Sequence, residues 1–162
     1  MKRSEINAVI KKFEALLAEY KFALPPYLSF TPEEWAEKGH ECDEIRDNKL
    51  GWDITDYGLD RFDEVGFALV TIRNGNLKDP KYKKPYAEKL LMLYPGQDSP
   101  LHYHWSKMED IINRGGNDLY ITVFNGADGN KKLDTDVTVV TDGVERTVPA
   151  GTKIKLTPGE SI

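Results

Sequence analysis

The spacing of apolar residues changes once along this chain, near residue 60. Before that point apolar side chains recur every three to four residues, which is the period of an amphipathic helix. After it they alternate with polar side chains over short runs bounded by Gly, Asp, Asn and Pro, which is the pattern of half-buried strands. The chain of 162 residues is therefore predicted to contain a helical extension over residues 1–60 that packs on a β-rich domain over residues 61–162.

The N-terminal part predicts two helices. Residues 4–20 carry one apolar stripe at helical spacing. Its members are Ile6, Val9, Ile10, Phe13, Leu16, Leu17 and Tyr20. A second helix is expected after Thr31, because Pro32 suits the first helical position and Glu34 completes a capping box. Gly39 is expected to end this helix.

The C-terminal part predicts many short strands separated by turns. The Asp142-Gly143 pair between two alternating runs indicates a tight hairpin. Short strands with turn residues between them favour a β-sandwich or barrel over a parallel sheet with crossover helices. The predicted strands span residues 67–72, 89–94, 101–105, 110–112, 119–124, 137–140, 145–148 and 153–156.

Composition excludes two classes of partner. Lysine and arginine number 22 against 27 aspartate and glutamate residues, and a net charge of −5 argues against a nucleic-acid surface. No apolar run is long enough for a membrane span, and charges interrupt the N-terminus where a signal peptide would be apolar. A single cysteine, Cys42, cannot form an internal disulfide, so we expect a cytoplasmic protein.

Three side chains close together in the sequence form the pattern of a metal site. In a strand, His102 and His104 point to the same face. Glu109 follows a predicted turn at residues 106–107 and is expected to return on the neighbouring strand. Two imidazole nitrogens and one carboxylate oxygen suit Mn²⁺, Fe²⁺, Co²⁺, Ni²⁺ or Zn²⁺, and ligand type alone does not choose among them. The alternative is that the two histidines are polar residues that bind no metal.

The same segment resembles the first motif of the cupin family. Gly96, His102, His104, Glu109 and Gly116 stand at the motif's spacing, with five, one, four and six residues between successive members. Cupins are jelly-roll barrels of the double-stranded β-helix type. The resemblance therefore implies a mainly β fold, with the N-terminal helices outside a barrel formed by residues 61–162.

Longer stretches narrow the resemblance to the D-lyxose isomerase family of cupins. They cover residues 51–58, 71–75, 84–116 and 155–161, and HYHWSKMEDIINRGG is the most specific. This resemblance implies a Mn²⁺-dependent aldose–ketose isomerase, usually a homodimer, that acts on small sugars. The aldose–ketose pairs implied are D-lyxose with D-xylulose and D-mannose with D-fructose. Each pair is expected to interconvert through a cis-enediol while the ion polarises O1 and O2 of the sugar. A hydride shift is the competing route.

The chain departs from the family in its fourth metal ligand, a histidine that cupins supply from a second motif. Residues 159–162 resemble the opening of that motif, but no histidine follows Glu109. His40 precedes the barrel and is expected at the surface. We therefore expect a truncated chain, with the fourth ligand, a second catalytic carboxylate and the last barrel strands beyond Ile162. Completion of the barrel by a partner chain is the alternative.

Two lysines and the carboxylate ligand are candidate catalytic residues. Glu109 is a poor base while it binds metal. Lys89 shares a strand face with Leu91 and Leu93, and binds a sugar hydroxyl or oxyanion if that face lines the barrel. Lys107 lies in the turn before Glu109 and is a candidate for substrate binding or oxyanion stabilisation. For each lysine the alternative is a solvated side chain.

A loop before the barrel carries two further candidates for sugar binding. Trp52 is placed to cover a sugar face and Asp56 to bind hydroxyls, with a core-anchoring tryptophan as the alternative. Tyr103 and Trp105 point away from the histidine face of the predicted strand and are expected in the core.

Two other functions stay open. One is a cupin metalloenzyme of different chemistry, such as a dioxygenase or a phosphosugar isomerase, although the lysines are scattered rather than clustered for phosphate. The other is a non-catalytic or inactive truncated cupin with a weak three-ligand metal site.

Overall fold

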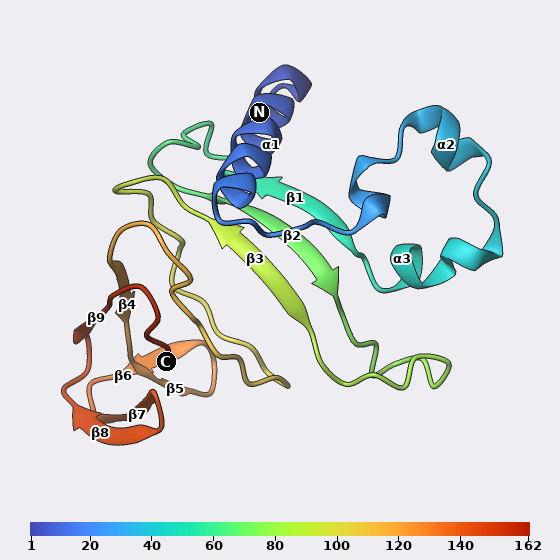
Figure 1. Cartoon of the computed structure of the whole chain (residues 1–162). Helices are drawn as coiled ribbons and strands as arrows, with labels where there is room; N and C mark the ends of the chain where they lie inside the picture. The colour runs from blue at the N-terminus through green and yellow to red at the C-terminus, as the bar shows by residue number, and fades with distance from the viewer. The chain divides into compact units, whose positions relative to one another are not determined.

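A computed structural model describes all 162 residues, which form two compact units, Met1–Pro100 and Leu101–Ile162 (Figure 1). The first unit contains α1 (Arg3–Glu19), α2 (Pro32–Ala36), α3 (Asp43–Asp47), β1 (Gly51–Thr55), β2 (Phe67–Arg73) and β3 (Glu88–Met92). The second contains β4 (Leu119–Thr122), β5 (Asn125–Ala127), β6 (Lys131–Leu133), β7 (Val137–Thr141), β8 (Val144–Val148) and β9 (Lys153–Leu156). Short 3₁₀ helices cover Pro26–Ser29 and His40–Cys42. The chain is mainly β with few helices, which is consistent with a cupin-like fold, and its strands form no closed barrel.

Helix α1 confirms the prediction from its apolar stripe. Its first turn is closed by the main-chain N–H of Lys2, which donates to the Glu5 carboxylate at 2.7 Å. Val9, Phe13 and Leu17 lie one helical turn apart and are buried. They pack in one core with the sheet of the same unit, and this packing gives the helix its stability. No helix of the structure has the length and apolarity needed to cross a bilayer.

The sheet of the first unit is antiparallel, in the order β1-β2-β3. In β2, Ala68 and Val70 are completely buried and Ile72 nearly so, whereas Arg73 is exposed. Burial of every second residue, Ala68, Val70 and Ile72, fits the pattern from which the strand was predicted, and Thr71 on the other face is buried as well. Strand β1 was not predicted; it lies before residue 60 and pairs with β2 from Gly51 to Thr55. The division into an extension over 1–60 and a barrel over 61–162 stays a prediction.

The small helices follow their capping signals only in part. The main-chain N–H of Glu34 donates to the Thr31 hydroxyl at 3.2 Å, and that of Thr31 donates to the Glu34 carboxylate at 2.8 Å. This capping box confirms the predicted start of α2. The helix ends at Ala36, before Gly39, and the short α3 was not predicted.

The second unit has its own core between paired strands. Strand β4 pairs with β9, β5 with β6 and β7 with β8, each antiparallel. The core contains Val137, Val139, Ile154 and Leu156. Asp142 and Gly143 join β7 to β8 with φ of 50° and 80°, so the predicted hairpin is confirmed with the positive φ angles that its turn requires.

Two predicted strands of this unit do not form. Residues 101–105 have no strand partner, and of residues 110–112 only Ile112 makes a bridge, to Ser161. A strand needs a neighbour for its main-chain hydrogen bonds, and local alternation does not supply one to residues 101–105. Tyr103 and Trp105, expected in the core, are consequently 48% and 79% exposed. Residues 110–112 do have a neighbour in residues 159–162, but the pairing is too short to make a strand.

The short strands β5 and β6 show the opposite error, because they form without having been predicted. Their sequences, NGA and KKL, are too short and too polar to show apolar alternation. Such a hairpin depends on its turn and on main-chain pairing, which hydrophobic spacing does not report.

We predict that Phe13→Ala lowers the free energy of unfolding by about 3 kcal/mol, because Phe13 is 2% exposed and its ring packs edge-on against Trp52 at 5.7 Å. The matched control is Tyr20→Ala at the end of α1, where the side chain is 51% exposed and we expect less than about 0.5 kcal/mol. Urea unfolding of the three chains tests this. Equal losses for both variants would contradict the packing of α1 on the sheet.

Candidate metal centre

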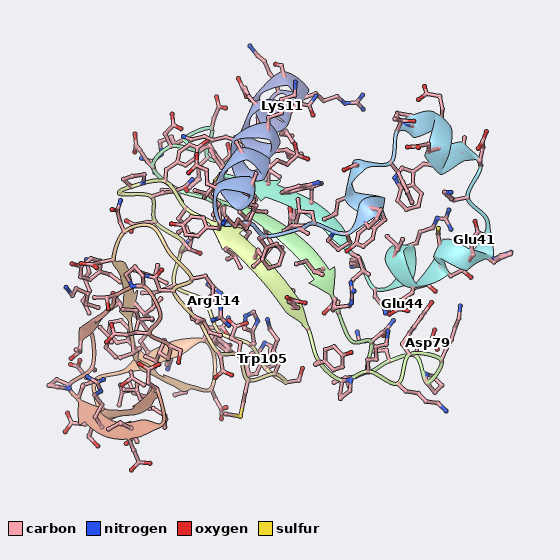
Figure 2. The ribbon with its side chains drawn as sticks, viewed as in Figure 1. Lys11, Glu41, Glu44, Asp79, Trp105 and Arg114 are labelled. Carbon is pink, nitrogen blue, oxygen red and sulfur yellow. The ribbon has the colours of Figure 1, made fainter.

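The candidate site lies on the loop that connects β3 to β4. Figure 2 labels Trp105 and Arg114 on this loop. His102, His104 and Glu109 all belong to the second unit and are all exposed. Residues 101–110 form neither helix nor strand.

The three side chains converge closely enough to hold one ion. One ligand atom from each lies within 4.8 Å of the others. His104 Nε2 and Glu109 Oε1 are 3.1 Å apart. Two ligands that each bind an ion at about 2.1 Å are about 3.0 Å apart at right angles and about 4.2 Å apart across the ion. Small side-chain rotations therefore suffice, and two nitrogens with one carboxylate oxygen fit a divalent transition metal.

The convergence arises without the strand from which it was predicted. The rings of His102 and His104 lie 5.3 Å apart, and those of Tyr103 and Trp105 lie 4.9 Å apart. Alternate side chains thus contact each other, as in extended backbone, although no neighbouring strand is paired here. Glu109 likewise approaches from the same loop rather than from a second strand.

Lys107 completes the electrostatics of the site. Its ammonium group donates to Glu109 Oε2 at 2.7 Å, while Glu109 Oε1 faces His104. Partial burial raises the pKa of Glu109, but the hydrogen bonds and positive charge of Lys107 and His104 outweigh that effect and lower it below its ordinary value. Glu109 is therefore ionised at neutral pH, which is the state that binds a cation.

The other predicted site residues lie in the first unit. Lys89 is on β3, opposite Thr71 of β2, and is exposed. Trp52 is half-buried; its ring packs against Phe13 and its indole N–H donates to the carbonyl of Leu28 at 3.4 Å. Their roles in sugar binding stay predictions.

Asp56 follows β1 and is 6% exposed. Its Oδ1 accepts from the main-chain N–H of Gly58 at 2.9 Å. Its Oδ2 is buried and has no hydrogen-bond partner, which is unusual for a buried carboxylate.

His40, expected at the surface, is fully exposed there and lies 3.2 Å from the carboxylate of Asp43.

One residue of the loop escaped the sequence analysis. Asn113 is 5% exposed and hydrogen-bonds to three other residues through its side chain. The available signal was local, because Asn two residues before Gly115 is typical of a turn in which the side chain bonds the main chain. Nothing in the spacing indicated that this amide also reaches β9.

Comparison with known proteins covers the whole chain. Residues 1–162 match the family model described as D-lyxose isomerase. A D-lyxose/D-mannose isomerase from Escherichia coli O157:H7 is 41% identical over 163 aligned residues, which cover 100% of this chain and 72% of that protein. A D-lyxose/D-mannose isomerase from Serratia proteamaculans is 40% identical over the same shares of the two chains.

We predict that His102→Ala and His104→Ala each lower the affinity for Mn²⁺ by more than roughly 100-fold, since each removes one of three ligands. The matched control is His40→Ala, which should bind Mn²⁺ like the unmodified chain. Titration of free Mn²⁺ by electron paramagnetic resonance measures this. Equal affinity in all four chains would show that the three side chains do not form the site.

Proposed function

The chain belongs to the D-lyxose isomerase family, and from this we propose that it is an aldose–ketose isomerase that interconverts D-lyxose with D-xylulose and D-mannose with D-fructose. The observation that carries the proposal is the convergence of His102, His104 and Glu109 on one point of an exposed loop. Exposure leaves coordination positions open, which catalytic metal sites require and purely structural ones do not.

We propose that these three side chains hold Mn²⁺. The donor set of two imidazoles and a carboxylate suits this ion, and the lowered pKa of Glu109 keeps the carboxylate ionised for it. Bound to the site, such an ion supplies Lewis-acid polarisation of a carbonyl oxygen. Glu109 takes part in catalysis by holding the ion, because its carboxylate lies with the two imidazoles around one point.

Lys107 is assigned the binding of a substrate oxygen. An ammonium group has three donors, and one of them engages Glu109, so the others remain for a sugar oxygen. When the C2 proton of the aldose leaves and the cis-enediol forms, negative charge develops on the carbonyl oxygen, and a donor fixed beforehand stabilises it. The base that removes the proton is a carboxylate other than Glu109.

Three residues of the first unit are proposed to contact the sugar. Asp56, which follows β1, is assigned a sugar hydroxyl. Lys89 is exposed on β3 and is assigned a hydroxyl or an oxyanion of the substrate. Trp52 is assigned a sugar face, with the part of its ring that the core leaves exposed.

We further propose a jelly-roll barrel of the cupin type, a homodimer and a cytoplasmic location. Support for self-association comes from large apolar side chains exposed on the metal-site loop. Leu101, Trp105 and Met108 are 59%, 79% and 99% exposed. Light scattering of the chain in solution tests the homodimer.

We predict that the chain with Mn²⁺ converts D-lyxose to D-xylulose and that Lys107→Met lowers kcat by roughly 100-fold at saturating Mn²⁺. Lys132→Met is the matched control, because Lys132 lies in the same unit over the ring of Phe124 and should leave kcat unchanged. Proton transfer through a cis-enediol also predicts deuterium at C1 of the ketose when the reaction runs in D₂O.

Three results would count against these assignments. Absence of D-xylulose with every divalent metal tested would reject the isomerase. Turnover that Lys107→Met leaves intact would reject the role of that lysine. A ketose free of deuterium would favour a hydride shift over the enediol.

A further inference from the structure

The segment that follows Glu109 continues a β-ladder. Strands β4 and β9 pair from Leu119 with Leu156 to Thr122 with Lys153. Beyond an interruption at residues 114–118 and 157–158, the same two chain segments meet again and run antiparallel. There Ile111 and Ile162 exchange both main-chain hydrogen bonds, at 2.7 and 3.0 Å. The ladder therefore reaches to within two residues of a metal-binding side chain.

Asn113 bridges the interruption with its side chain. Its Nδ2 donates to the carbonyl of Leu156, the last residue of β9, at 2.9 Å and to that of Asn117 at 3.0 Å. Its Oδ1 accepts from the main-chain N–H of Gly115 at 3.1 Å. The amide is buried and its polar atoms are all hydrogen-bonded. These side-chain hydrogen bonds connect the two segments where the main-chain pairing is interrupted.

The main chain of Asn113 is held at the same point. Its N–H donates to the carbonyl of Glu160 at 2.9 Å, and its carbonyl accepts from Gly159 at 2.7 Å. Residues 159–162 are themselves anchored, because both the N–H and the hydroxyl of Ser161 donate to Asp142 in the β7–β8 turn, at 2.9 and 2.8 Å. Residues 159–162, which pair with residues 111–113, are thus held by the β7–β8 turn of the same unit.

Glu160 closes the adjoining turn. Its carboxylate accepts from the main-chain N–H of Thr157 at 2.6 Å and from the Thr157 hydroxyl at 2.9 Å. These hydrogen bonds, the main-chain one first, lower the pKa of Glu160, so the turn keeps its ionised cap at neutral pH.

This framework restricts Glu109. Two residues of extended chain span at most about 7 Å, so the fixed main chain of Ile111 confines the position from which the Glu109 carboxylate is presented. The histidines lie five and seven residues earlier, on a stretch without regular structure. Correct placement of the carboxylate therefore depends on the ladder on its C-terminal side.

We propose that Asn113 is a positioning residue for the metal ligand Glu109: its buried amide closes the interrupted ladder between residues 111–113 and 159–162, and so sets the carboxylate beside His104. The inference rests on the metal centre of the proposed function. It adds to that centre a residue that contacts neither ion nor sugar.

A double-mutant cycle on the whole chain tests this role, with Ni²⁺ as the probe and calorimetry as the measurement. Imidazole-rich sites bind Ni²⁺ more tightly than Mn²⁺, so a two-histidine remnant stays measurable. Asn113→Ala should lower the affinity for Ni²⁺ about tenfold when Glu109 is present, as loss of a supporting contact does. In the Glu109→Ala background the same substitution should change affinity less than about twofold, because its effect acts through the carboxylate.

Asn125→Ala is the matched control. Asn125 is another amide of the second unit with two Nδ2 hydrogen bonds, to Thr135 at 3.0 Å and to Asp136 at 2.8 Å. It should leave Ni²⁺ affinity unchanged. Where Asn113→Ala fails to fold by circular dichroism, Asn113→Asp and Gly159→Ala carry the test. The first replaces the amide donors by a carboxylate oxygen that faces the carbonyls of Asn117 and Leu156. The second strains the turn at φ +103° from the opposite side of the ladder.

Each outcome decides between the two claims. A tenfold loss confined to chains that contain Glu109 supports the positioning role. An equal loss in both backgrounds, or no loss in either, overturns it while leaving the metal centre intact. Failure of the unmodified chain to bind Ni²⁺ or Mn²⁺ overturns both the metal centre and the inference.

Discussion

The candidate metal centre lies on a loop without helix or strand that is followed directly by paired main chain. Residues 101–110 form no helix or strand, yet they carry all three candidate ligands. The main-chain pairing of Ile111 with Ile162 ends this stretch at a fixed point. The Glu109 carboxylate is two residues from this point, and the histidines are seven and nine residues from it. All three candidate ligands are exposed, which leaves positions around an ion open to other ligands.

Charge organises the site more than burial does. Glu109 lies between the imidazole of His104 and the ammonium group of Lys107, and its carboxylate offsets the positive charge of the lysine. Because these groups are substantially exposed, their attraction is screened by water and adds little to stability. The attraction instead keeps the Glu109 carboxylate ionised and sets the direction in which it points. Stability comes instead from the two apolar cores, one beneath α1 and one between β4, β7 and β9.

The elements that were predicted correctly from the sequence are those whose signals lie within a few neighbouring residues. Helix α1 and the β7–β8 hairpin were predicted well, because the period of an apolar stripe and the Asp142-Gly143 turn act within a few residues. Strand β1 was missed, since its GWDIT sequence shows no clear alternation and it is stabilised by pairing with β2. Residues 101–105 alternate as a strand should, but alternation describes the faces of a strand and cannot supply its neighbour.

The sequence by itself determined the chemistry of the site. The types and spacing of His102, His104 and Glu109 predicted a divalent-metal site, because ligand chemistry is a property of residue types at short separation. The longer stretches around them, HYHWSKMEDIINRGG above all, predicted the family to which the chain belongs. Only the tertiary structure decided how those residues are held. The contact of Asn113 with Leu156 joins positions 43 residues apart, and no periodic or local signal reports a hydrogen bond across that distance in the chain.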